Sequence, residues 1–183
     1  MKTLIFNVII EPLKERYSVQ WEKWFKECFE AHQVQYLPIE GEQRSQTIEH
    51  GSFLDVIDTN RWKTEQQKRI INLLSVFDDK EEWIFFFHDL WHPTLTMLGY
   101  IRDGMGWKNL KIVGCLHAGI YDEYDFLNKQ GMTPWAKHIE KGWFAHLVDQ
   151  MYVATKFHKE LLIKERDIDC CKIKKTGFPF YRS

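Results

Sequence analysis

The sequence predicts an α/β fold built on a doubly wound, mostly parallel sheet. Short apolar runs alternate with segments in which apolar residues recur every three or four positions, and this alternation is typical of strands followed by amphipathic helices. Strand–helix alternation of this kind favours right-handed crossovers between parallel strands. The 183 residues are enough for one good core. We therefore expect a single domain over residues 1–183.

The individual elements follow from the same periodicities. Strands are expected at 3–10, 34–39, 83–87, 110–116, 151–155 and within 171–180, and helices at 17–33, 62–77, 94–103, 135–150 and 156–166. Residues 53–58 alternate only weakly, and Gly41 to Gly51 is a polar loop. The run Trp83 to Phe87 is apolar throughout, so we expect a strand buried on both faces of the sheet.

Composition limits the class of protein. Hydrophobic residues make up 44% of the chain, too many for a disordered protein. The 25 basic and 26 acidic residues give a net charge of −1, which supports no bulk attraction to nucleic acid or membrane. The apolar runs are too short for a membrane span. Four cysteines without a CxxC pair indicate reduced thiols. The apolar start of the chain is interrupted by Asn7, and no small-residue cleavage site of a signal peptide follows it. We therefore expect a cytoplasmic protein.

Two predicted strands end in histidine. His88 and Asp89 follow the run that ends at Phe87, and His117 follows the strand at 110–116. Because open α/β sheets bind ligands at the carboxyl ends of their strands, we expect both histidines at one edge of a parallel sheet of at least six strands. A histidine with a carboxylate partner can be tuned to exchange protons near neutral pH. His88, Asp89 and His117 are therefore the candidate catalytic residues.

The loops after these two strands supply further candidates for ligand binding. They are Trp91, His92, Gly119, Asp122 and Glu123. An exposed Trp can stack on a sugar or a base, or else simply pack. Gly119 leaves room for a ligand to approach the backbone, and the acids follow shortly after it.

Two other interpretations of these residues stay open. His88, His92, Asp89 and an acid from 122–125 could hold a metal, since the two histidines have the i,i+4 spacing of a helical metal site. However, Pro93 is a favoured residue for starting a helix, so that helix would begin only after the second ligand. We therefore expect no metal. Alternatively, the histidines only cap strand ends and satisfy loop backbone groups.

The order of these parts resembles the amino-terminal Rossmann-like domain of GT-B glycosyltransferases, particularly the large retaining family four. The likeness extends from about Trp83 to Phe180. In that family, one strand ends in a histidine at the cleft, and a second strand also ends in a cleft histidine. A third strand with a following basic helix comes next, and a turn then leads towards a second domain. The matching stretches are FFFHD at His88, IVGCLHAG at His117, VDQMYVATKFHKELL at Asp149 and Thr155, and KIKKTGFPF at Gly177 and Pro179.

The resemblance implies a glycosyltransferase that moves a sugar from a nucleotide-sugar donor and needs neither cofactor nor metal. His117 would contact the donor sugar or the charge of the transition state. His88 and Asp89 would bind the acceptor hydroxyl, and Asp89 would be the base if the enzyme inverts configuration. The acceptor pocket would be formed by Trp91, His92, Gly119, Asp122 and Glu123. The acceptor itself stays open between a sugar, a lipid and a modified base in tRNA or DNA.

The sequence departs from the family in two places. Glu11 and Pro12 follow the first strand where the family has a glycine-rich turn. The carboxyl-terminal, donor-binding domain is absent, so we expect this chain to be the amino-terminal half, with a second GT-B domain covalently attached or separate. The alternatives are a non-catalytic nucleotide- or partner-binding module on the same fold and a metal-dependent hydrolase.

Overall fold

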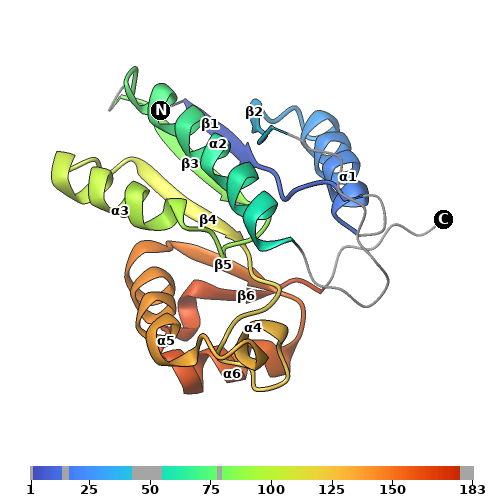
Figure 1. The fold of residues 1–183 in the computed structure, drawn as a ribbon. Coiled ribbons are helices and arrows are strands. Elements are labelled where there is room, and N and C mark those ends of the chain that lie inside the picture. The colour runs from blue at the N-terminus through green and yellow to red at the C-terminus, as the bar shows by residue number, and fades with distance from the viewer. Residues whose placement is uncertain (1, 14–16, 43–54, 78–79, 178–183) are drawn as a thin grey trace.

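The computed structural model describes residues 2–13, 17–42, 55–77 and 80–177, and within them forms a single six-stranded, all-parallel sheet (Figure 1). The strand order is β2-β1-β3-β4-β5-β6. The predicted α/β class with a doubly wound parallel sheet is confirmed. The strands are β1 Thr3–Val8, β2 Tyr36–Ile39, β3 Glu82–Phe87, β4 Leu110–Cys115, β5 Gln150–Val153 and β6 Ile173–Lys175.

Helices connect the strands in the predicted order. One of them, the short helix α4, was not predicted. None of the described helices is long and apolar enough to cross a membrane. The helices are α1 Ser18–Ala31, α2 Val56–Leu74, α3 Thr94–Met105, α4 Phe126–Lys129, α5 Thr133–Lys141, α6 Lys156–Arg166, a π-helical turn η1 Gly142–Leu147 and a 3₁₀ turn η2 Cys170–Lys172.

Helix α2 begins six residues earlier than the sequence predicts. Asp55 is its N-cap, and the side chain accepts a hydrogen bond of 2.9 Å from the backbone N–H of Asp58. This cap explains why residues 55–58 alternate only weakly, since they start a helix. The predicted loop at 43–51, residues 53–54 and the end of the last predicted strand at 178–180 lie outside the described residues.

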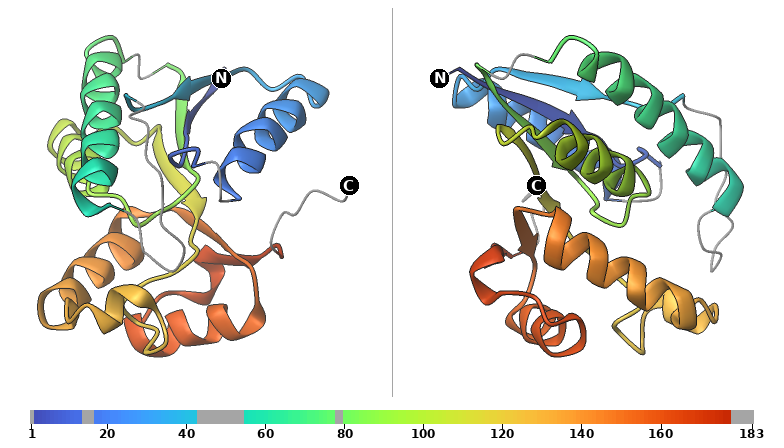
Figure 2. Two further views of the ribbon diagram at one scale, coloured as in Figure 1. Left: turned by 45° about the vertical axis from the view of Figure 1, so that its right-hand side comes forward. Right: turned by 90° about the vertical axis from the view of Figure 1, so that its left-hand side faces the viewer.

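Helices cover the two faces of the sheet unequally. The step from β1 to β2 runs in one direction along the sheet, and all later steps run in the other. Because crossovers are right-handed, α1 lies on one face and the remaining long helices lie on the opposite face (Figure 2). The main core agrees, since it joins sheet residues to α2, α3, η1 and α6 and contains no residue of α1.

The strand β3 reflects this imbalance. Trp83, Phe85 and Phe87 are buried in the main core, whereas Ile84 and Phe86 are only half-buried on the face of α1. The prediction that this run is buried on both faces is therefore wrong for the α1 face. The physical reason is that one helix of 14 residues is too short to cover six strands.

Close contact between β3 and β4 requires a glycine at position 114. A Cβ atom there would lie 2.3 Å from the carbonyl oxygen of Phe87, its partner residue in the parallel register, and 3.1 Å from a methyl group of Leu90. Any side chain at this position would push the two central strands apart. Gly114 therefore allows the ends of β3 and β4 to lie in close contact, just before the two loops that carry the predicted histidines.

We expect Phe85→Ala to lower the free energy of unfolding by about 3–5 kcal/mol, because its fully buried ring would leave a cavity in the core. Phe86→Ala, one residue away on the half-buried face, is the matched control and should cost clearly less. Chemical denaturation of the two variants would measure both values. Equal losses would contradict the unequal burial of the two faces.

Candidate functional site

The loops after β3 and β4 meet at the carboxyl edge of the sheet. The Nε2–H of His117 donates a hydrogen bond of 2.6 Å to the carbonyl oxygen of His88. Next to it, the backbone N–H of Leu90 donates to the carbonyl oxygen of Cys115 at 2.8 Å. The expectation that His88 and His117 lie at one edge of the sheet is confirmed.

His88 is buried and electrically neutral. Its Nε2–H donates to the side-chain oxygen of Asn7 on β1 at 2.8 Å, and its ring packs against Phe25 of α1 at a centroid distance of 4.5 Å. Burial, and to a lesser extent the charge of His117, lowers the pKa of His88 to about 3. Among the described residues, Nδ1 has no hydrogen-bonding partner. His88 therefore reaches the candidate site through its backbone carbonyl.

His117 is half-buried and lies at the carboxyl edge of the sheet. Its ring lies 4.7 Å from the ring of Trp21 and 5.4 Å from that of Tyr17, measured between centroids. The bond to the carbonyl of His88 fixes the tautomer that carries the proton on Nε2. Of the two histidines, His117 is the one whose ring lines an open cavity.

Asp89 and Trp91 are held in one tight loop. One carboxylate oxygen of Asp89 accepts a hydrogen bond of 3.0 Å from the backbone N–H of Trp91. The indole N–H of Trp91 donates to Glu140 at 3.0 Å, and the Nζ of Lys63 donates to the carbonyl oxygen of Trp91 at 2.7 Å. The indole thus packs in place, while Asp89 stays half-buried at the edge.

His92 serves as a buried link between elements. Its Nδ1 accepts a bond of 3.2 Å from the backbone N–H of Thr94, and its Nε2–H donates to the side-chain oxygen of Gln66 at 3.1 Å. The amide of Gln66 in turn donates to the carbonyl oxygens of Ile9 and Ile39. Both ring nitrogens are therefore occupied, and this geometry gives the predicted contact with an acceptor no support.

Glu140 on α5 is the fully buried group that joins these loops. Its Oε1 accepts hydrogen bonds from the backbone N–H of Ile120 at 2.7 Å and from the indole of Trp91 at 3.0 Å. Its Oε2 lies 2.8 Å from two guanidinium nitrogens of Arg166 at the end of α6. One carboxylate therefore links the loop after β3, the loop after β4 and two helices.

Gly119 is required by this packing. A Cβ atom at Gly119 would lie 2.1 Å from the ring of Tyr121 and 2.8 Å from Oε1 of Glu140. The space that the sequence suggests for a ligand is thus filled by the chain's own side chains. A larger residue here would displace the Glu140 carboxylate from its partners.

The predicted acidic group after His117 is only partly at the site. Asp122 is half-buried and accepts from the backbone N–H of Tyr124 at 2.9 Å, while Glu123 is exposed. Nearby, the hydroxyl of Tyr121 donates to Nε2 of His158. Burial, with a smaller contribution from His117, lowers the pKa of His158 to about 4.

The alternative metal site is not assembled. Among the described residues, the one group of three or more histidine, cysteine or carboxylate side chains whose ligand atoms lie within 4.8 Å of one another is the exposed Asp169, Cys170 and Cys171 at η2. They are remote in sequence from His88 and His92, whose Nε2 atoms already bond Asn7 and Gln66.

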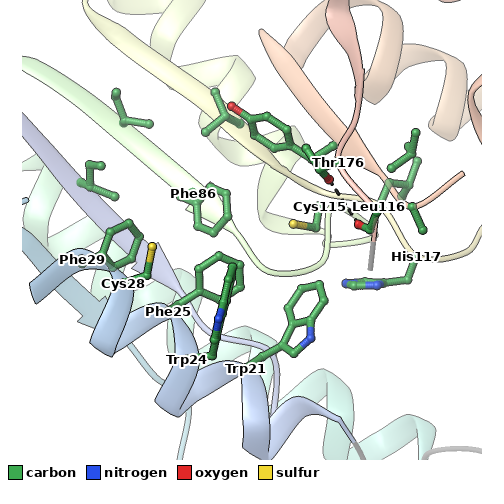
Figure 3. Close-up of a pocket in the computed structure, with 17 residues that line it drawn as sticks. Trp21, Trp24, Phe25, Cys28, Phe29, Phe86, Cys115, Leu116, His117 and Thr176 are labelled. Carbon is green, nitrogen blue, oxygen red and sulfur yellow. Dashed lines mark hydrogen bonds between the residues drawn. The ribbon is translucent and has the colours of Figure 1, made fainter. Parts of the chain in front are cut away.

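An apolar groove lies between α1 and the half-covered face of the sheet. Its volume is about 580 Å³, and His117 and Thr176 lie at one end (Figure 3). Trp24, Phe25 and Phe29 of α1 face Phe86 of β3 across it. A cavity of this size with a mostly apolar lining is typical of small-molecule sites.

Other residues of the family-like stretches have structural tasks. Asp149 accepts from the backbone N–H of Ile112 at 2.8 Å and lies 3.2 Å from Arg102, which fixes the start of β5 against β4. Thr155 is the N-cap of α6 and accepts from the backbone N–H of His158 at 3.0 Å. These contacts explain the residues physically without a ligand.

Comparisons with protein families and with curated sequences found no match. No protein-family model matches the chain, and no curated protein sequence is significantly similar to it. Any functional conclusion therefore depends on the geometry of the site.

Several residues that form the edge carry no local signal in the sequence. Asn7, Lys63, Glu140 and Arg166 come from separate elements and are joined only by tertiary contacts. Glu11 is different, because it directly follows the predicted apolar run 3–10, just as His88 follows the run that ends at Phe87. The same signal, a polar residue directly after an apolar strand, could have identified it.

We expect Arg166→Met to lower the free energy of unfolding by about 3–5 kcal/mol, because it leaves the carboxylate of Glu140 buried without its charge partner. Lys141→Met is the matched control, since it breaks an exposed pair with Asp167 between the same two helices and should cost about 1 kcal/mol or less. Urea denaturation measures both. Similar losses would show that the buried pair is unimportant.

Acidification should weaken the fold between about pH 6.5 and pH 4. The pKa values of His88 and His158 lie below the ordinary value of about 6.5. In this pH range the unfolded chain therefore binds protons at these two histidines that the folded chain does not bind. Each histidine contributes a loss of up to about 1.4 kcal/mol per pH unit. Denaturation at pH 7, 6 and 5 checks this, and His88→Gln should flatten the dependence. An unchanged slope would contradict neutral burial of His88.

Proposed function

We propose that the chain is the acceptor-side half of a glycosyltransferase that uses a nucleotide-sugar donor. The observation that carries the proposal is the position of His117. Its imidazole lies at the carboxyl edge of a parallel sheet, is fixed in one tautomer by the carbonyl of His88, and borders an open cavity. This is where an open α/β sheet offers polar groups to a ligand.

In the proposed reaction, His117 and Asp89 have different tasks. His117 contacts the donor sugar or the charge that develops as the nucleotide leaves. Asp89 uses the carboxylate oxygen that does not bond Trp91 to bind the acceptor hydroxyl, and serves as base if the enzyme inverts configuration. His88 acts as a positioning residue through its carbonyl, since its neutral ring is buried.

The donor would be held by a second GT-B domain, covalently attached or separate. The proposed mechanism assigns no step to a metal or a cofactor. We also propose a cytoplasmic location, which the four free cysteines support.

The alternative function is a binding module without catalysis. The groove beneath α1 is the observation that favours it, because its volume of about 580 Å³ and apolar lining suit a small apolar molecule. In that case Asp89→Asn, at the carboxyl edge but outside the groove lining, would leave ligand binding unchanged. No observation favours the metal-dependent hydrolase.

We expect His117→Ala to lower the rate of sugar transfer by about 10²–10³, because one contact to developing charge is lost. The assay measures transfer from a panel of labelled nucleotide sugars in the full-length protein. Exposed His138 on α5 provides the control, and His138→Ala should leave the rate unchanged. Asp89→Asn should reduce both acceptor binding and rate.

The outcome that rejects the proposal is also clear. Wild-type turnover in both His117→Ala and Asp89→Asn, with the fold intact by circular dichroism, would leave these residues as structural caps. Absence of transfer by the wild-type full-length protein from every donor tested would favour the binding module.

A further inference from the structure

A small cavity with several polar side chains in its wall lies where the strand order reverses. The chain moves outward from β1 to β2 and then crosses to β3 on the other side of β1, so the reversal falls between β1 and β3. Open α/β sheets bind ligands outside the carboxyl ends of the strands at this point. A cavity of about 50 Å³ occupies it, and its polar side chains include Glu11, Thr59, Lys63 and Asp89.

Glu11 is the residue that indicates a ligand, because one of its carboxylate oxygens accepts no hydrogen bond from the described residues. The side chain follows β1 and the residue is only 6% exposed. Its Oε2 is buried and has no hydrogen-bonding partner among the described residues. Burial, followed by the charge of Asp58, raises the pKa of Glu11. The hydroxyl of Thr59 lies near Glu11 and opposes the rise of its pKa, but it makes no hydrogen bond of ordinary geometry to Oε2. A buried acceptor without such a bond costs stability, so an external donor would be favourable here.

Lys63 supplies the complementary donor. Its ammonium gives one hydrogen bond of 2.7 Å to the carbonyl oxygen of Trp91. An ammonium group has three donors, so two remain beyond that bond. No carboxylate lies within ion-pair distance of Lys63 among the residues that the structure describes, although Asp89 and Glu11 both lie close enough to oppose the lowering of its pKa by burial.

The mixed charge of the cavity selects the ligand's chemistry. A phosphate or carboxylate would meet the like charges of Glu11 and Asp89, and an amine would meet the like charge of Lys63. A neutral hydroxyl group satisfies both, because it donates to a carboxylate and accepts from an ammonium. The volume of about 50 Å³ admits a group little larger than a water molecule, such as a hydroxymethyl group.

We infer that Glu11 and Lys63 bind a hydroxyl group of a carbohydrate acceptor in this cavity, next to Asp89. The inference rests on the proposed function and deepens it, because it selects the sugar among the acceptor classes that the sequence leaves open. Half-buried Thr59, Lys63 and Asp89 form the outer side through which the hydroxyl enters. The rest of the sugar ring then lies over the edge that carries Asp89 and His117.

Direct binding tests the inference without requiring sugar transfer. Methyl glucoside, methyl mannoside and myo-inositol are titrated into the ¹⁵N-labelled 183-residue chain, and the indole N–H signals of Trp62 and Trp91 report binding. Tetrahydropyran, which lacks hydroxyl groups, is the negative probe. We expect saturable shifts with at least one hydroxylated probe, and a loss of affinity of about tenfold or more in Glu11→Gln and Lys63→Met.

Matched controls lie on the exposed side of α2. Glu65→Gln and Lys68→Met change the same residue types on that helix and should leave the affinity unchanged. Glu11→Gln should also keep or raise the midpoint of urea unfolding, because it removes an unpaired buried carboxylate. A purely structural Glu11 would instead lower that midpoint and leave sugar binding as in the wild type.

The outcomes separate the inference from the proposed function. No saturable shift with any hydroxylated probe, or equal shifts with tetrahydropyran, would mean that the cavity holds water only and would overturn the inference. Transfer by the full-length protein to a lipid or a nucleobase, with KM unchanged in Glu11→Gln, would overturn it while the transferase proposal stands. Sugar binding that Glu11→Gln weakens, without any transfer, would support the cavity and reject the transferase.

Discussion

The buried carboxylate of Glu140 is the group on which the carboxyl edge of this sheet depends. It accepts hydrogen bonds from the loop after β3, through Trp91, and from the loop after β4, through Ile120. Arg166 compensates its charge and is held in turn at the end of α6. Without this pair, the two loops would be joined only by the bonds at the strand ends, from His117 to the carbonyl of His88 and from Leu90 to the carbonyl of Cys115, and the site would lose part of its geometry.

The sequence predicts the architecture well because the physics involved is local. Apolar periodicity identifies all six strands and the five long helices, although α2 and α5 differ at their ends. The ends of two strands also locate the site, since parallel strands place their carboxyl ends at one edge. Thus His88 and His117 meet as expected, through a bond from a side chain to the backbone.

The roles of the individual side chains could not be predicted from local patterns. His88 and His92 look alike in the sequence, and both prove to be buried and bonded to Asn7 and Gln66 on other elements. Such pairings join residues up to 81 positions apart, and a single sequence contains no signal for them. The half-covered face of the sheet could not be predicted from the sequence for a related reason. Strand order decides on which face each helix lies, and strand order is itself a tertiary property.

The apolar character of β3 has a consequence for how the strand finds its alignment during folding. Both of its faces are apolar, so sliding by one residue would exchange Phe85 and Phe87 for Ile84 and Phe86 with little hydrophobic penalty. The same slip would turn the imidazole of His88 away from Asn7 and into the main core, where a polar ring costs free energy. The histidine that ends the strand therefore also specifies its register.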